Sequence, residues 1–236
     1  MIRYTTDSTA PTAASTAYVT PIVVSATTLF RARAFATNLQ PGEIRSEAYV
    51  QLDSVAGIVN FTSSLPILIL HNLGGGGVPA SVDQPVVIEV FEPKNGISSM
   101  TNTPDLAERG IFHLRGSSTL GYPKGSFALE VDDELGRDKY VSFISDLPKN
   151  SDWVLYAPNN FEPVLVHNPV AHDLQRQAGH YGSRTRFVEV YLKDDGGVPG
   201  KVVSGDYNGI YVLEEKPKIS KDRVNIDKLQ AHRRRP

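Results

Sequence analysis

The second half of the chain is dominated by short apolar runs that have the two signatures of β-strands. Residues 127–131 alternate between large apolar side chains and small or charged ones, as in a strand with one buried face. Residues 187–192 and 210–213 are almost wholly apolar or aromatic, which is typical of central strands. From residue 111 onward the sequence therefore predicts a sheet, and this limits the fold to a strand-rich class.

A single clear helix interrupts these strands. Asn168 is a favourable N-cap, and Pro169 suits the first helical position. An apolar stripe follows and stops at a glycine; it consists of Val170, Leu174, Ala178 and then Gly179. The predicted fold class is therefore α+β: a mainly antiparallel sheet with one prominent helix packed on it.

The N-terminal part of the chain has a different composition, in which Thr, Ser and Ala dominate. Residues 19–24 and 28–36 have the β-branched or alternating character of strands. We therefore predict a small β-sandwich-like module over residues 1–40. A Pro-Gly pair then marks the start of a connector over residues 41–64.

Charge and composition exclude several classes of function. With 24 basic and 26 acidic side chains the net charge is -2, so no nucleic-acid or membrane partner is indicated. The absence of cysteine excludes disulfides and thiolate sites. The apolar run 65–70 is too short to span a bilayer, and the N-terminus does not resemble a signal peptide. Residues 231–236 are predicted to be a solvated basic tail.

One loop has residues suited to contact a phosphate group. Its small residues are Gly116, Ser117, Ser118, Thr119 and Gly121, which let backbone N–H groups approach an anion. Lys124 follows just before the strand 127–131, where it is placed like a phosphate-contacting lysine or, alternatively, a solvated one. A Walker loop is excluded, because Tyr122 and Pro123 separate the glycine from the lysine and Pro123 has no N–H to donate.

Other catalytic schemes find little support. His167 and His172 are five residues apart, which places them on different sides of a helix rather than in line for a metal ion. No G-x-S-x-G elbow is present for a serine hydrolase. We predict no metal-ligating residues.

Several short sequence segments follow one another in the order found in a known family. They are residues 115–119, 121–124, 151–158, 184–190, 208–216 and 222–226. Together they resemble the first part of the CotH family, the atypical protein kinases of bacterial spore coats. The resemblance implies a kinase-like nucleotide lobe over residues 65–230, with ATP and magnesium as cofactors. It also implies phosphorylation of Ser or Thr in coat or other extracellular proteins, and an extracellular or cell-surface location.

The resemblance also assigns roles to residues. Lys124 is the sole candidate for the phosphate lysine, because Gly125 stands where the family usually has a second one. Asp173 is the only carboxylate inside the helix and is the expected partner of that lysine. Glu214 and Glu215 end a strand that leads to the adenine site, although both could simply face solvent. The predicted nucleotide-binding set is Gly116, Ser117, Ser118, Gly121, Lys124, Asp173, Glu214 and Glu215.

The N-terminal segment resembles a second family. Residues 4–12, 17–18 and 29–34 are similar to the chitobiase C-terminal-like repeat found beside carbohydrate-active domains. Ser8 stands where that family usually has a glycine. The resemblance implies an incomplete repeat and a possible carbohydrate contact.

The family's catalytic acidic motifs are expected beyond residue 226, and only ten residues follow it. We therefore expect a fragment of a CotH-like kinase that is inactive alone. The alternative is a non-catalytic extracellular or cell-surface binding protein, and a third hypothesis is a degenerate kinase.

Overall fold

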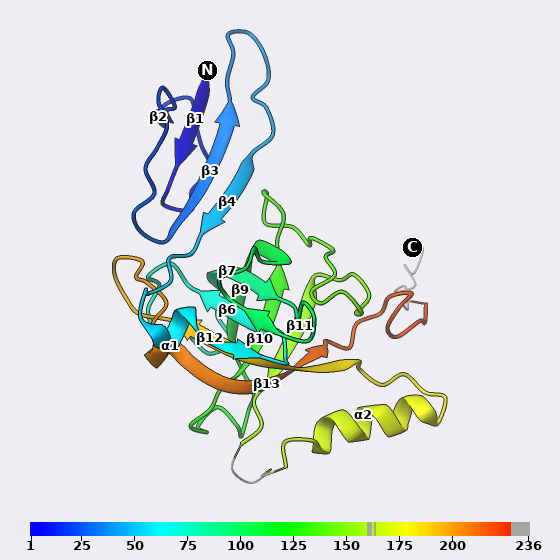
Figure 1. The fold of residues 1–236 in the computed structure, drawn as a ribbon. Coiled ribbons are helices and arrows are strands. Elements are labelled where there is room, and N and C mark those ends of the chain that lie inside the picture. The colour runs from blue at the N-terminus through cyan, green and yellow to red at the C-terminus, as the bar shows by residue number, and fades with distance from the viewer. Residues whose placement is uncertain (160–161, 163, 228–236) are drawn as a thin grey trace, which may run out of the picture.

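The chain forms a small N-terminal sheet and a larger closed barrel (Figure 1). The computed structural model describes residues 1–159, 162 and 164–227. The basic tail predicted at 231–236 and the end of the lobe predicted over 65–230 lie outside the described residues.

The N-terminal sheet has four antiparallel strands in the order β2-β1-β3-β4. Their bounds are β1 Ile2–Thr5, β2 Thr16–Ala17, β3 Thr28–Ala34 and β4 Arg45–Tyr49. The prediction of a sandwich-like module was wrong, because the described strands of this region make one sheet rather than two packed sheets. Strand β4 falls in the segment predicted as a connector and completes the sheet beside β3.

The strand expected at residues 19–24 is absent from the described structure, which has an irregular segment there. Val19 and Val23 are 80% and 89% exposed. Pro21 lies in the middle of the segment and has no N–H for a strand ladder. β-branched residues favour strands only where neighbours pack against them, and these side chains have solvent around them.

The barrel closes in the order β10-β11-β13-β12-β6-β7-β9, with β9 pairing back to β10. Its strands are β6 Ile67–His71, β7 Gln84–Phe91, β9 Leu106–Arg115, β10 Ser126–Val131, β11 Asp152–Tyr156, β12 Thr185–Lys193 and β13 Tyr207–Glu215. All neighbours are antiparallel except β6 and β12. The fold is β-rich as predicted, but the kinase-like N-lobe with a mainly antiparallel sheet is corrected to a closed seven-stranded barrel. Closure removes the exposed strand edges that an open sheet would have.

Alternation along the strands fills the barrel interior. Residues 86, 88 and 90 of β7 point inward, as do Phe127 and Leu129 of β10, and all are at most 2% exposed. Trp153 is fully buried beside Phe143, at a centroid distance of 5.4 Å. A second apolar cluster lies outside the barrel and includes Ile67, Phe91, Met100 and Tyr191. The short elements α1 Ala56–Val59, β5 Thr62–Ser63, β8 Ser98–Ser99 and the 3-10 turn η1 Ser204–Asp206 belong to the connections between strands.

Helix α2, His167–Gln177, exists where the sequence predicts a helix but differs in its start and packing. Its N-cap is Val166, so Asn168 lies inside the first turn and makes no cap. None of its described residues is buried, and Val170 and Leu174 are 48% and 59% exposed. The prediction of a helix packed on the sheet was therefore wrong, and Figure 1 shows α2 set to one side of the barrel.

Hydrogen bonds from buried side chains join the N-terminal part of the chain to the barrel. Arg31 on β3 bonds to Glu134 in the β10–β11 connection, and the Thr27 hydroxyl donates to the carbonyl of Gly200 at 2.9 Å. Both Arg31 and Thr27 are buried. None of the helices in the described part of the chain has the length and apolar character needed to span a bilayer.

Candidate functional site

Three of the predicted nucleotide-binding residues line one hollow of about 290 Å³ at the end of the barrel. They are Gly116, Lys124 and Glu214, and Arg115, Tyr156 and Asn168 line the hollow with them. We call it the Lys124 hollow. It lies where β9 ends and β10 begins, so the loop between these strands forms one of its walls.

The loop is shaped by its first glycine. Gly116 has φ +133°, and a Cβ there would lie 2.2 Å from the Thr119 hydroxyl oxygen, so only glycine fits without a rearrangement. The Tyr122 N–H donates to the carbonyl of Thr119 at 3.2 Å and closes a turn. Three other predicted residues, Ser117, Ser118 and Gly121, are exposed and do not line the hollow. The structure therefore does not bring them together as a backbone cradle.

Lys124 reaches toward the middle of β13. Its ammonium group donates to the carbonyl of Ile210 and lies 4.2 Å from the centre of the Tyr211 ring. Gly209, with φ +87°, leaves the space beside this group open. Burial lowers the pKa of Lys124 to about 8, and the nearby Glu189 carboxylate opposes that shift. A lysine with this pKa is mostly charged at pH 7 and still has N–H donors for an anion.

Glu214 is the carboxylate of the hollow. It is 8% exposed, and its Oε1 atom is buried without a hydrogen-bond partner. Burial raises the pKa of Glu214 to about 7, while Arg115 and Asn168 act in the opposite direction. This carboxyl group is therefore partly protonated at neutral pH, and its neutral form can donate a hydrogen bond to a ligand oxygen.

The sequence interpretation missed Glu162, which is 2% exposed. Its Oε1 accepts the backbone N–H of His167 at 2.7 Å, and its Oε2 accepts the Tyr156 hydroxyl at 2.6 Å. The first contact places a carboxylate at the N-terminus of α2, where the helix dipole favours negative charge. The second fixes Tyr156, a wall of the hollow. An acidic residue shortly before a predicted helix start was the available signal.

Two predicted site residues have other partners. Asp173 accepts hydrogen bonds from Arg176 at 2.9 Å and Gln177 at 2.6 Å along its own helix, and it makes no described contact with Lys124. The start of α2 reaches the hollow through Asn168, but Asp173 lies further along the helix with its side chain 53% exposed.

Glu215 is 1% exposed and accepts both the backbone N–H of Arg184 at 3.0 Å and its guanidinium at 2.8 Å. It points to the opposite face from Glu214, as neighbours on a strand do. Neither Glu214 nor Glu215 faces solvent, so that alternative was wrong.

The hollow offers little to a divalent cation. Among the described residues, Glu214 is its single lining carboxylate. Across residues 1–159, 162 and 164–227 no group of three or more His, Asp or Glu side chains is arranged to hold a metal ion. The arrangement is instead suited to an anion, which Lys124 and Arg115 would attract.

Comparison with known protein families separates the N-terminal sheet from the second half of the chain. A family model described as CotH kinase protein matches residues 112–233, more than half of the 236-residue chain. A second model, described as Fn3 associated, matches residues 1–49. This second match covers the region of the chitobiase-like resemblance and includes β4. No curated protein matches the chain.

Proposed function

Because the chain belongs to the CotH kinase protein family, we propose that it binds ATP, with the phosphates in the Lys124 hollow. The observation that carries this proposal is the position of Lys124, which lines the hollow with Arg115 and Gly116. Two cationic side chains beside a glycine-led loop suit a polyphosphate anion. The volume of about 290 Å³ is at the low end for small-molecule sites, which start near 300 Å³, so it suits the phosphates better than a whole nucleotide.

The neutral form of Glu214 supports the same ligand. A charged carboxylate beside phosphate oxygens would repel them, whereas a protonated one donates a hydrogen bond. The pKa of about 7 makes the protonated form accessible at neutral pH. A bound phosphate would raise that pKa further, since nearby negative charge favours the neutral acid.

Magnesium, which the family resemblance implies, does not fit the residues of this hollow. Mg²⁺ prefers ionised carboxylate ligands, and Glu214 is one carboxyl group with a raised pKa. We therefore assign nucleotide binding, and no phosphoryl transfer, to these residues. A Ser/Thr-rich coat protein as phosphate acceptor is a proposal from the resemblance alone.

Calorimetric titration with ATP tests the binding proposal. We expect Lys124→Met to weaken binding by about tenfold or more, because a charge-assisted hydrogen bond to phosphate is lost. Lys149→Met is the matched control, since Lys149 is an exposed lysine that does not line the hollow. Equal affinity of the two variants, or tight binding of adenosine without phosphates, would place the ligand elsewhere.

A kinase assay tests the assignment of binding without transfer. The protein is incubated with labelled ATP, magnesium and a Ser-rich acceptor, and no incorporation is expected. Clear incorporation that is lost in Lys124→Ala would show that the chain transfers phosphate and would overturn this part of the proposal.

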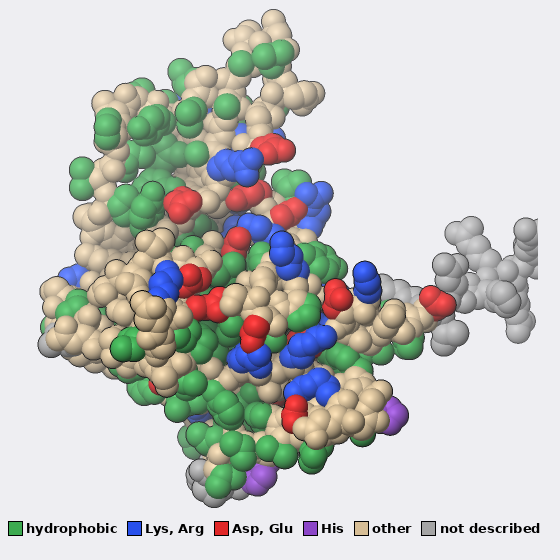
Figure 2. Space-filling model, turned by 45° about the vertical axis from the view of Figure 1, so that its right-hand side comes forward, with side chains coloured by type: hydrophobic (Ala, Val, Ile, Leu, Met, Phe, Trp, Pro, Cys, Tyr) green, Lys and Arg blue, Asp and Glu red, His purple; other side chains and the backbone are tan. Residues whose placement is uncertain are grey.

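A second candidate function is a non-catalytic extracellular or cell-surface binding protein, which one observation favours. Hydrophobic side chains gather on the surface of the N-terminal sheet in Figure 2, and Val19 and Val23 are among the most exposed apolar residues of the chain. Such exposed apolar groups favour contact with a partner. A glycan array, with the ATP titration as its counterpart, separates the two functions. In either case the family suggests a spore coat or surface location.

A further inference from the structure

A hollow of about 440 Å³ lies between the N-terminal sheet and the barrel, on the face opposite to the barrel interior. Strand β4 contributes Glu47 and Tyr49, β7 contributes Glu89 and Phe91, and β9 contributes Ala107. We call it the Glu89 hollow. Its volume is within the usual range of small-molecule sites, about 300 to 1,000 Å³.

Strand alternation explains why a carboxylate is buried here. Ile88 and Val90 face the barrel interior, so Glu89 between them faces outward. Its partner across the ladder is Ala107, whose small side chain leaves space above the sheet. Strand β4 of the N-terminal sheet borders this space, and Glu89 is 8% exposed.

The Glu89 carboxylate has no hydrogen bond or ion pair with any residue among those described. Burial alone raises the pKa of Glu89 to about 7. A carboxylate that is largely withdrawn from water without a partner is unfavourable, and native proteins normally pair it.

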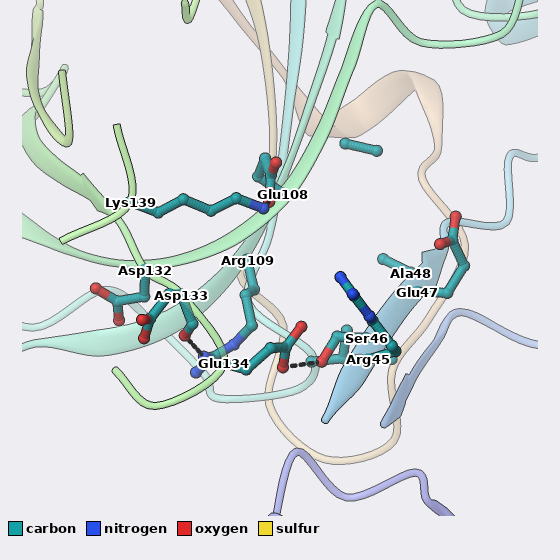
Figure 3. A pocket seen from close by; sticks show the side chains of 12 residues that line it. Arg45, Ser46, Glu47, Ala48, Glu108, Arg109, Asp132, Asp133, Glu134 and Lys139 are labelled. Atoms are coloured by element: carbon teal, nitrogen blue, oxygen red, sulfur yellow. Dashed lines mark hydrogen bonds and ion pairs between the residues drawn. The ribbon is translucent and has the colours of Figure 1, made fainter. Parts of the chain in front are cut away.

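Two acids of the neighbouring hollow, drawn in Figure 3, show the usual arrangement. There Glu108 pairs with Lys139 at 2.6 Å, and Glu134 accepts the Ser46 hydroxyl at 2.6 Å. Glu108 and Glu134 have partners from within the chain, whereas Glu89 has none described. Glu47 lies between the two hollows, and its side chain in Figure 3 extends away from Glu134.

Among the residues that the structure describes, no Lys, Arg or His lines the Glu89 hollow. Glu47 and Glu89 supply negative charge, and Tyr49, Phe91 and Met100 supply aromatic and thioether surface. Asn102 and Thr103 are its neutral polar lining residues. Negative charge next to an aromatic wall is the environment that a cation with an apolar body prefers.

We propose that the Glu89 hollow binds an organic cation, a ligand with an alkylammonium or guanidinium head group and a short apolar body. The head group donates hydrogen bonds to Glu89, which supplies the partner that this carboxylate lacks. The apolar body lies against Phe91 and Met100, and the Tyr49 ring adds a favourable cation–π contact.

The test uses n-butylammonium as the probe and 1-butanol as its neutral counterpart of similar size, titrated by NMR at pH 8. We expect n-butylammonium to bind at least tenfold more tightly than butanol, and Glu89→Gln to remove this difference. Glu108→Gln is the matched control, because that carboxylate pairs with Lys139 in the neighbouring hollow. Thermal unfolding of both variants confirms that they fold.

Three outcomes would overturn the proposal: equal binding of butanol, unchanged binding in Glu89→Gln, or no saturable binding of the amine in the millimolar range, which would mean that the hollow holds water only. A pH series adds a further check. The affinity for n-butylammonium should fall as the pH decreases from 8 to 6, because Glu89 takes up a proton near pH 7. Glu47 and Tyr49 are the other titratable groups that line the hollow, and Glu47→Gln should leave this midpoint in place.

Discussion

The guanidinium group of Arg31 donates to the backbone carbonyl of Glu134 at 2.6 Å and lies 3.3 Å from its carboxylate. The same carboxylate accepts the Ser46 hydroxyl at 2.6 Å, and a second guanidinium nitrogen donates to the carbonyl of Ser8 at 3.0 Å. Arg31 therefore joins β3 and the loop between β1 and β2 to the loop between β10 and β11 of the barrel. The position of this sheet also determines the depth of the Glu89 hollow, because β4 forms one of its walls.

We predict that Arg31→Met destabilises the protein by about 2 kcal/mol, since it leaves Glu134 without its buried partner. This loss of stability is smaller than is usual for a buried ion pair, because the Glu134 side chain is 30% exposed. Urea unfolding followed by circular dichroism measures the change. Arg45→Met is the control: its pair with Glu43 is 84% and 86% exposed, so we expect about 0.5 kcal/mol or less. Equal effects of the two variants would contradict the role of Arg31.

The lowered pKa of Lys124 predicts a particular dependence of stability on pH. Its pKa is about 8 in the folded chain and near the ordinary 10.5 in the unfolded one, so between these values the unfolded state binds more protons. The free energy of unfolding should therefore gain a contribution as the pH rises from about 8 to 10.5.

Lys124→Met should remove this contribution without lowering stability at pH 7. Urea unfolding at pH 7.5 and pH 10, monitored by the fluorescence of the single tryptophan Trp153, compares it with the wild type. In Lys149→Met the free energy of unfolding should change between the two pH values as in the wild type. If the free energy of unfolding of Lys124→Met still rose between pH 7.5 and pH 10, the effect would belong to another group.

The structure brings three of the predicted site residues together, for a physical reason. Gly116 and Lys124 flank one loop, and Glu214 ends a strand whose neighbours run to the same end of the barrel. Local patterns are enough to identify such a loop and such a strand end. The roles of these residues toward a nucleotide stay predictions.

The closed barrel and the position of the helix could not be predicted in this way. Closure depends on the parallel pairing of β6 with β12, in which Ile67 lies opposite Glu189, far away in the chain. The stripe of Val170 and Leu174 has the period of a packed helix, yet both are largely exposed. Periodicity gives the face of a helix but does not identify what covers that face. For this reason the prediction that Asp173 is the partner of Lys124 was wrong, because Asp173 accepts a hydrogen bond from Arg176 instead.

The raised pKa of Glu214 predicts the opposite pH dependence from Lys124. Its pKa is about 7 in the folded chain against an ordinary 4.5, so the folded state binds more protons in this window. The free energy of unfolding should fall as the pH rises from about 4.5 to 7, and the full penalty is present above pH 7.

Glu214→Gln should therefore stabilise the protein at pH 8, by about 1 to 3 kcal/mol, and have little effect at pH 4. The neighbouring Glu215→Gln is a control with the opposite sign. It removes the charge that pairs with Arg184 and should destabilise by about 3 kcal/mol. Unfolding midpoints in urea at the two pH values distinguish these results, and destabilisation by Glu214→Gln at pH 8 would show that Arg115 and Asn168 outweigh the burial of the carboxylate.

Helix α2 is predicted to open without unfolding of the barrel, because none of its described residues is buried. At its N-terminus Glu162 accepts the N–H of His167, and near its C-terminus Arg176 donates to the carbonyl of Ser183. An isolated helix of this length is marginal in water, so its order depends on these end contacts. Glu162→Gln should increase the hydrogen-exchange rates of the α2 amides, while the exchange rates of the β12 amides stay unchanged.

Mass spectrometry of peptides from the two elements measures this difference. Asp173→Asn is the matched control, because it removes only a pair on the exposed face of the helix and should change exchange little. Tyr156→Phe removes the other hydrogen bond of Glu162 and should give a smaller increase in the same peptides. If Glu162→Gln accelerated exchange in β12 as strongly as in α2, the helix and the barrel would open as one unit. The hydrogen bonds of Glu162 would then stabilise the barrel as well as the helix.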